Sequence, residues 1–176
     1  GYTGKFEIVI ENANGDTPTA DLIAKQFVSD KVDLIYAIAT PAAQAAFNAT
    51  QGTDIPVVFN AVTDAVAAGI VASNDAPGGN VTGVSDAAPL DLQLQLIKEL
   101  MPEAKKIGML YNLGEVNGLI QVEQVQALAP QFGLEVVATG VTTAAEMASA
   151  AQQIAGEVDA FYNITDNLVV SNTAIV

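Results

Sequence analysis

The sequence contains no cysteine, no histidine and no tryptophan among its 176 residues. Without cysteine the chain forms no disulfide bond and offers no thiol nucleophile. Without histidine it lacks the commonest general base, and the two absences together remove the usual zinc ligands. An enzyme built from this chain would have to work with carboxylates, hydroxyls, lysine and tyrosine alone.

Basic residues are also scarce. Six lysines and arginines stand against 20 aspartates and glutamates, which gives a formal net charge of −14. Such a surface repels phosphate backbones, so we expect no nucleic-acid partner, and anionic membrane surfaces are disfavoured too. Solubility is the preferred interpretation of the charge. No apolar run approaches the roughly 18 residues that cross a bilayer, and residues 1–5 lack the features of a signal peptide.

Hydrophobic residues make up 51% of the chain, and they fall in strand-like segments that alternate with helix-like ones. We predict strands at 32–39, 55–62, 81–85, 106–111, 134–141 and 158–164, after a short apolar run at 6–10. We predict helices at 17–28, 40–49, 64–71, 89–101, 117–132 and 143–156, and a helical run from 166. The alternation and the continuously apolar strands favour βαβ units with parallel sheets. The architecture is therefore doubly wound α/β, in two lobes divided near residues 75–90.

Two helix starts carry recognisable signals. Thr17 is a candidate N-cap with Pro18 at the first helical position. Thr143 and Glu146 have the spacing of a capping box.

The predicted strands end in polar residues that precede helices. The ends are 39–42, 60–64, 85–86, 112–117 and 163–167. Ligands of open parallel sheets bind at the carboxyl ends of the strands, where free helix N–H groups can hold a carboxylate. Asp and Glu at these ends could hold an ammonium group, so the set suits a zwitterion such as an amino acid. The alternative is that Asn, Thr and Asp here are ordinary helix caps.

A short sequence pattern that occurs twice supports two lobes. The sequence 59–64 places an aromatic residue, an amide, a hydroxyl and a carboxylate at a strand end, and 162–166 repeats this order. Phe59, Tyr111 and Tyr162 could stack on a flat ligand or pack in the core, and the sequence leaves both open. For Tyr36, core packing is the preferred interpretation.

Several segments resemble one family in order along nearly the whole chain. They are 27–35, 37–44, 55–64, 77–86, 95–100, 107–112 and 165–171. These segments are similar to the substrate-binding proteins of ABC transporters, of the tryptophan/tyrosine type. The resemblance implies a periplasmic-binding-protein type 1-like α/β fold, with two Rossmann-like lobes and parallel sheets, incomplete at both termini. Residues 1–86 would form a first lobe lacking its first strand and helix, and 87–176 a second lobe lacking C-terminal units.

The resemblance also implies a function. The chain would be the extracytoplasmic solute-binding component of an ABC importer, in the periplasm or as a membrane-anchored lipoprotein. It would bind an amino acid, preferably aromatic, between lobes that close about a hinge near 83–88, and pass it to the importer's membrane subunits. No cofactor and no catalytic residue are implied. By position, the ligand contacts would be Thr40, Pro41, Ala42, Thr63, Asp64, Ser85, Asp86, Asn112, Glu115, Asn117, Thr165, Asp166 and Asn167.

Two other function classes share this kind of fold. An effector-sensing domain of a transcription regulator would be marked by a helix-turn-helix segment and a basic patch, and neither is present. An α/β enzyme would need a nucleophile or base with a partner, and the missing histidine and cysteine argue against the common choices. The solute-binding function is therefore preferred, and we expect no enzyme.

Overall fold

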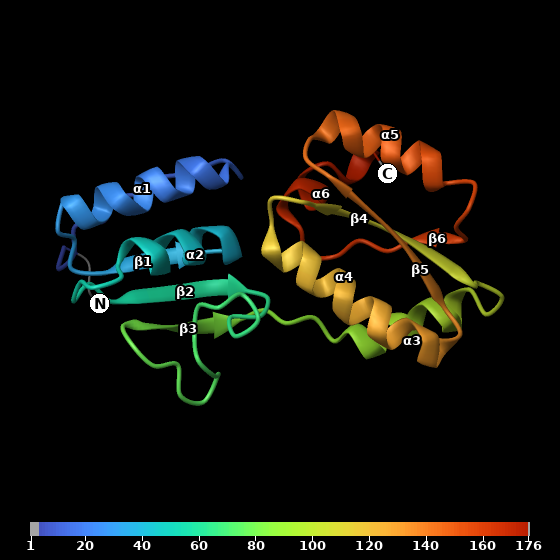
Figure 1. Ribbon diagram of the computed structural model, residues 1–176, viewed down its shortest axis with the longest axis horizontal. Helices are drawn as coiled ribbons and strands as arrows, with labels where there is room; N and C mark the ends of the chain where they lie inside the picture. The colour runs from blue at the N-terminus through green and yellow to red at the C-terminus, as the bar shows by residue number, and fades with distance from the viewer. Residues whose placement is uncertain (1–3, 176) are drawn as a thin grey trace.

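The computed structural model describes residues 4–175 and contains two α/β units joined by one connection (Figure 1). The N-terminal unit comprises α1 (Thr17–Ser29), β1 (Ile35–Ile38), α2 (Thr40–Ala49), β2 (Val57–Val62) and β3 (Val81–Ser85). The C-terminal unit comprises α3 (Leu90–Leu100), β4 (Lys106–Asn112), α4 (Val116–Leu128), η1 (Ala129–Phe132), β5 (Glu135–Val141), α5 (Ala144–Ile154), β6 (Ala160–Phe161), α6 (Asn167–Ser171) and η2 (Thr173–Ile175).

Each unit contains one parallel sheet, as the continuous apolar strands predict. The strand orders are β1-β2-β3 and β5-β4-β6, and every described pairing is parallel. Figure 1 shows β2 and β3 directed toward the C-terminal unit, while β4 runs back toward the N-terminal unit. The carboxyl ends of the two sheets therefore face one another, and the predicted α/β fold with parallel sheets is confirmed.

The second sheet is covered on both faces, and residues 107–110 of its central strand are buried. Ile107 and Met109 of β4 pack with Leu94 of α3 and Val125 of α4. Leu110 faces the other way and packs with Met147 of α5, in a cluster that also contains part of α6. This two-sided burial is the usual condition of a parallel sheet.

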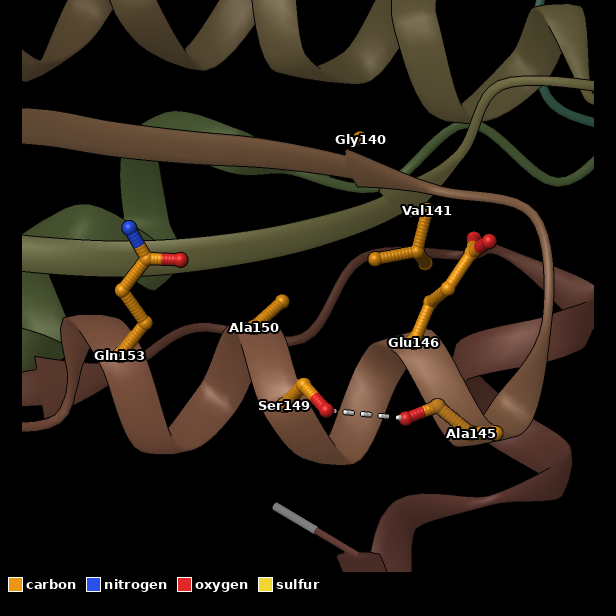
Figure 2. A pocket seen from close by; sticks show the side chains of 7 residues that line it. All are labelled: Gly140, Val141, Ala145, Glu146, Ser149, Ala150 and Gln153. Carbon is orange, nitrogen blue, oxygen red and sulfur yellow. Dashed lines mark hydrogen bonds between the residues drawn. The ribbon is translucent and has the colours of Figure 1, made fainter.

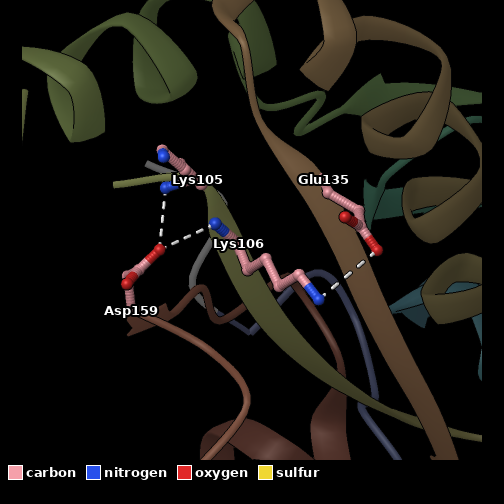
Figure 3. Close-up of polar contacts among 4 residues, drawn as sticks. All are labelled: Lys105, Lys106, Glu135 and Asp159. Carbon is pink, nitrogen blue, oxygen red and sulfur yellow. Dashed lines mark hydrogen bonds and ion pairs between the residues drawn. The ribbon is translucent and has the colours of Figure 1, made fainter. Parts of the chain in front are cut away.

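Asp159 fixes the amino end of β4 (Figure 3). Its carboxylate accepts the backbone N–H of Lys105 at 2.7 Å and of Lys106 at 2.9 Å. These two hydrogen bonds stabilise the charged carboxylate and so lower the pKa of Asp159, the bond from Lys105 having the larger effect. The Lys106 ammonium lies 3.9 Å from Glu135 on β5, an exposed pair that contributes little. The charged groups thus gather at the edge of the sheet opposite the polar strand ends.

The first sheet is covered on one face only by the described residues. Ile35, Val57 and Phe59 point into a core shared with α2 and the 63–72 segment. The opposite face presents Tyr36, Ile38 and Val84, which are 56%, 60% and 63% exposed. The expectation that Tyr36 packs in the core is wrong, because β1 alternates buried and exposed residues.

Some predicted elements differ from the structure. The apolar run at 6–10 belongs to no helix or strand. Residues 64–69 form turns rather than a helix, with the N–H of Ile70 donating to the Ala65 carbonyl. The strand predicted at 158–164 shortens to the two residues of β6, which pair with Ile107 and Gly108 of β4.

The helix caps follow the sequence in one case and depart from it in the other. Asp16, not Thr17, is the N-cap of α1, and its carboxylate accepts the N–H of Thr19 at 2.8 Å. Thr143 caps α5 as predicted, accepting the N–H of Glu146. No helix within residues 4–175 combines the length and apolarity needed to span a bilayer.

Gly83 on β3 provides a test of the first core. A Cβ atom there would lie 2.2 Å from the Phe59 carbonyl oxygen and 2.4 Å from its ring. We predict that Gly83→Ala lowers the free energy of unfolding by about 1–3 kcal/mol through overpacking, measured by urea denaturation. A Cβ atom at Gly156 would have nothing within 4 Å, so Gly156→Ala is the matched control and should be neutral or stabilising. Equal loss in both variants would contradict the packing argument.

Candidate functional site

The strand ends of the first sheet carry backbone strain. Ala39 follows β1 with φ 72°, and Ala61 near the end of β2 has φ 54°. The two lie side by side because Ile38 pairs with Asn60, and the N–H of Ala39 donates to the Asn60 carbonyl at 3.0 Å. Non-glycine residues with positive φ are strained, and such residues cluster at functional sites. The strain marks this edge of the sheet as a candidate site.

Helix α2 begins at this edge without a side-chain cap. Its N-cap is Ala39, which offers no acceptor, and Pro41 occupies the first turn. Thr40 is buried, and within residues 4–175 its hydroxyl makes no hydrogen bond. Ala42 continues the first turn. The start of α2 thus presents an unused hydroxyl and unsatisfied helix N–H groups.

The ends of β2 and β3 are tied together next to it. The Ser85 hydroxyl donates to the Thr63 carbonyl at 3.1 Å, and the Asp86 N–H donates to Val62 at 3.2 Å. Thr63 is buried, and its own hydroxyl forms no hydrogen bond in the described part of the chain. Asp64 accepts the N–H of Ala67 at 2.9 Å with one oxygen. Threonine hydroxyls at two neighbouring strand ends are therefore unengaged.

The C-terminal unit differs, because its predicted site residues bind one another. Glu115 is only 3% exposed, and its carboxylate accepts hydrogen bonds from three amide side chains and two backbone N–H groups. The side-chain donors are Asn112, Asn117 and Asn167, and the N–H groups are those of Asn167 and Leu168. The carboxylate thus joins the loop after β4 to the first turn of α6.

Asp166 is the second buried carboxylate, with 1% exposure. It caps α6 by accepting the N–H of Val169 at 3.1 Å, and it accepts the N–H of Asn112 at 2.7 Å. Burial raises the pKa of Asp166, which the two N–H donors partly offset. Gly118 on α4 permits this approach, since a Cβ there would lie 2.5 Å from Oδ2 of Asp166.

Gln121 completes the network and was missed by the sequence reasoning. It is buried, donates to the Thr165 carbonyl at 3.1 Å and accepts the Thr165 N–H at 3.2 Å. Its signal was its spacing: Gln121 follows Asn117 by one helical turn, so both face the 165 loop. Asn117 donates to the same carbonyl at 2.8 Å. Its Oδ1 atom is buried without a hydrogen-bond partner among the described residues.

The structure therefore separates the predicted residues into two groups. Those of the first sheet gather at one strained edge and keep unused polar groups. Those of the second sheet gather around Glu115 and Asp166, where most of their hydrogen-bonding groups are consumed. The two groups are linked by Gln124 of α4, whose amide lies 3.4 Å from Oδ2 of Asp64.

The aromatic candidates pack in the cores. Phe59 is buried over Gly83, and Tyr111 packs against the second core. The Tyr162 hydroxyl donates to Gln93 of α3, and burial raises its pKa to about 12. Phe59 is buried and Tyr162 is half-buried in these clusters, so both take part in core packing.

A shallow hollow lies elsewhere, between the end of β5 and α5 (Figure 2). Its polar side chains include Glu146 and Ser149. Glu146 is engaged by the N–H and hydroxyl of Thr142, both at 2.7 Å, and Ser149 donates to the Ala145 carbonyl. None of the predicted site residues lines it, and Glu146 and Ser149 are engaged within α5 and at its start.

The fold and the facing strand ends define a protein of the periplasmic-binding-protein type 1 class. A family model described as ABC transporter substrate binding protein matches residues 1–176, and the chain belongs to this family. The resemblance found in the sequence is thus confirmed.

Three relatives are informative. A tyrosine-binding protein of Clostridioides difficile (strain R20291) is 51% identical over 171 residues, which cover 97% of this chain and 49% of that protein. A domain from Streptococcus pneumonia in complex with L-Trp is 40% identical, with a TM-score of 0.94, over 99% of this chain and 59% of its own. The chain therefore spans about half the length of its curated relative.

The third is a ligand-free, open substrate binding protein with adhesive properties from Clostridium difficile. It is 46% identical to this chain, with a TM-score of 0.61. The match covers 99% of this chain and 58% of the open protein. The chain thus superposes better on the L-Trp complex than on the open protein, although the open protein is more similar in sequence.

Glu115 can be tested as the centre of its network. We predict that Glu115→Ala lowers the free energy of unfolding by about 3 kcal/mol or more, because several buried amide donors lose their acceptor. The measurement is urea denaturation followed by circular dichroism. Glu99→Ala removes an exposed carboxylate that accepts from Gln95, and it should change stability by less than about 0.5 kcal/mol. A small effect at Glu115 would show that water replaces it.

Asp166 gives a pH test. The pKa of Asp166 is higher in the folded chain than in the unfolded chain. The carboxyl group therefore contributes its full stabilisation at a pH below its pKa in the unfolded chain, and this contribution is lost as the pH rises through its pKa in the folded chain. The other carboxyl groups contribute equally to the pH dependence of the wild-type chain and of Asp166→Asn, so their contributions cancel in the comparison. We predict that lowering the pH from about 7 toward about 4 stabilises the wild-type chain relative to Asp166→Asn in denaturant titrations. A constant difference across this range would mean that the pKa of Asp166 is not raised.

Proposed function

We propose that this chain binds an aromatic amino acid between the carboxyl ends of its two sheets, as part of an extracytoplasmic solute-binding protein of an ABC importer. Family membership supports the substrate-binding role. The tyrosine-binding relative and the L-Trp complex support an aromatic amino acid as ligand. The observation that carries the proposal is the facing arrangement of two parallel sheets with polar ends.

The first sheet supplies the direct ligand contacts in this proposal. The ligand carboxylate is held by the uncapped start of α2, at Thr40, Pro41 and Ala42, where the helix dipole favours an anion. The Thr63 hydroxyl donates a further hydrogen bond. Asp64 faces the ligand ammonium, with Ser85 and Asp86 completing this side.

The second sheet supplies a rigid counterpart. Glu115 and Asp166 hold Asn112, Asn117 and Asn167 in place, so that the loops present a fixed surface to the ligand. The free Oδ1 atom of Asn117 is an acceptor for a ligand N–H group, since a buried polar atom without a partner is costly. Thr165, whose carbonyl accepts from Asn117, is exposed and adds a hydroxyl to this side.

Two lobes would close because both sheets contact the same ligand in this proposal. We take residues 1–86 and 87–176 as the lobes, with the hinge near 83–88. A ligand that contacts both lobes favours the closed arrangement by its differential affinity, and the importer's membrane subunits would recognise that state. Nothing in this scheme requires a bond to be made or broken, so the chain acts by binding and not as an enzyme.

The test is equilibrium binding of L-tryptophan, L-tyrosine, L-phenylalanine and several non-aromatic amino acids. The chain has no tryptophan, so the fluorescence of ligand L-tryptophan is free of protein background. We predict saturable binding of at least one aromatic amino acid. A folded chain that binds none of the aromatic ligands would contradict the proposal.

Two isosteric variants locate the ligand. We predict that Thr40→Val and Thr63→Val each weaken binding about ten-fold, because each removes one hydrogen bond to a charged group, worth about 1.5 kcal/mol or more. Thr82→Val on the exposed side of β3 is the matched control and should leave affinity unchanged. Calorimetric titration measures all three. Equal affinities for the three variants would place the ligand elsewhere.

A further inference from the structure

Gln124 lies where the two units meet. Helices α2 and α4 are in contact, and Figure 1 shows the first turn of α4 next to the N-terminal unit. From the third turn of α4, Gln124 donates its Nε2 to Oδ2 of Asp64 at 3.4 Å. This side-chain hydrogen bond joins the N-terminal unit to the C-terminal unit.

Both partners are held in position by their own units. Oδ1 of Asp64 accepts the N–H of Ala67, which leaves Oδ2 directed at α4. On α4, the neighbouring Val125 is fully buried, and Gln121 is fixed by the 165 loop. The half-buried Gln124 therefore extends from a helix face that cannot rotate. The hydrogen bond depends on the relative placement of the two units rather than on local flexibility.

The chain superposes unequally on two comparison structures. The chain superposes with a TM-score of 0.94 on the L-Trp complex and 0.61 on the ligand-free, open protein. The hydrogen bond is thus observed in an arrangement that matches a ligand-bound relative.

We propose that Gln124 is a positioning residue that fixes the Asp64 carboxylate from across the binding site when the two units close. This role deepens the proposed function and rests on it. Asp64 then has two partners on one carboxylate, Ala67 from its own unit and Gln124 from the opposite one. Opening breaks the second contact, so the bond adds to ligand affinity only through the closed arrangement.

A pair of opposite charge substitutions tests this role. Gln124→Lys places an ammonium against Asp64 and favours closure, whereas Gln124→Glu places a second carboxylate there and opposes it. Gln126 lies on the same helix and is exposed, so Gln126→Lys and Gln126→Glu change the net charge equally and serve as matched controls. The readout is the radius of gyration of the ligand-free chain from X-ray scattering, at low and at high salt.

We expect the ligand-free Gln124→Lys chain to have a smaller radius of gyration than Gln126→Lys, with the difference reduced at high salt. Affinity does not separate the two roles, because Asp64 faces the ligand ammonium and a charge beside it changes binding directly. The ligand-free Gln124→Glu chain should be more extended than Gln126→Glu. In an Asp64→Asn background the difference in radius of gyration between the two Gln124 variants should shrink.

Equal behaviour of the Gln124 and Gln126 pairs in scattering would overturn the proposal, because charge alone would then explain any change. The same holds if the effect persists without the Asp64 charge. If the wild-type chain binds no aromatic amino acid, the proposed function fails, while the scattering comparison still decides whether Gln124 holds the closed arrangement.

Discussion

The C-terminal half of the candidate site depends on a buried carboxylate that has no cation beside it among the described residues. Glu115 lies under three amide side chains and two backbone N–H groups, and these donors replace the water lost on burial. Because the donors come from the end of β4 and the first turns of α4 and α6, the carboxylate fixes three segments at once. Asp166 does the same for β4 and α6. With few basic residues in the chain, amide groups serve where ion pairs would otherwise occur.

This arrangement assigns different tasks to similar residues. Around Glu115, asparagine and aspartate are consumed by the fold, so their loops are rigid. At the ends of β1 and β2, threonines are buried with unused hydroxyls, and the backbone is strained at Ala39 and Ala61. Backbone strain costs stability and persists only where surrounding packing outweighs it, whereas the two hydroxyls stay available to a ligand. The contrast explains how one site can combine a rigid wall with a binding edge.

The sequence predicted the fold well because hydrophobic periodicity and parallel topology are strong signals. The segments 81–85 and 40–49 were predicted with the bounds that the structure shows. The polar strand ends were also predictable, since parallel strands collect their carboxyl ends at one edge. Their roles were not, because a helix cap, a network member and a ligand contact use the same residue types. Asp166 caps α6 and also binds Asn112, which no local pattern could reveal.

Tertiary context decided the remaining differences. Asp16 takes the place of Thr17 as the N-cap, since its carboxylate accepts the N–H of Thr19. Tyr36 was expected inside because β1 reads as apolar on both faces, yet only the Ile35 face is covered by described residues. The sequence did not identify Gln121 and Gln124 as site residues, because glutamine on a helix is usually solvated. Only the approach of the 165 loop and of Asp64 gives them partners.

The bare face of the first sheet has a consequence for how the chain behaves in solution. Tyr36, Ile38 and Val84 form an apolar surface on a sheet whose strand β1 lies at an edge among the described residues. Surfaces of this kind adhere to one another, and sheet edges accept further strands. The net charge of −14 opposes such encounters by mutual repulsion. Ionic strength therefore sets the balance between dispersed and self-associated chains, with dilute salt keeping them apart.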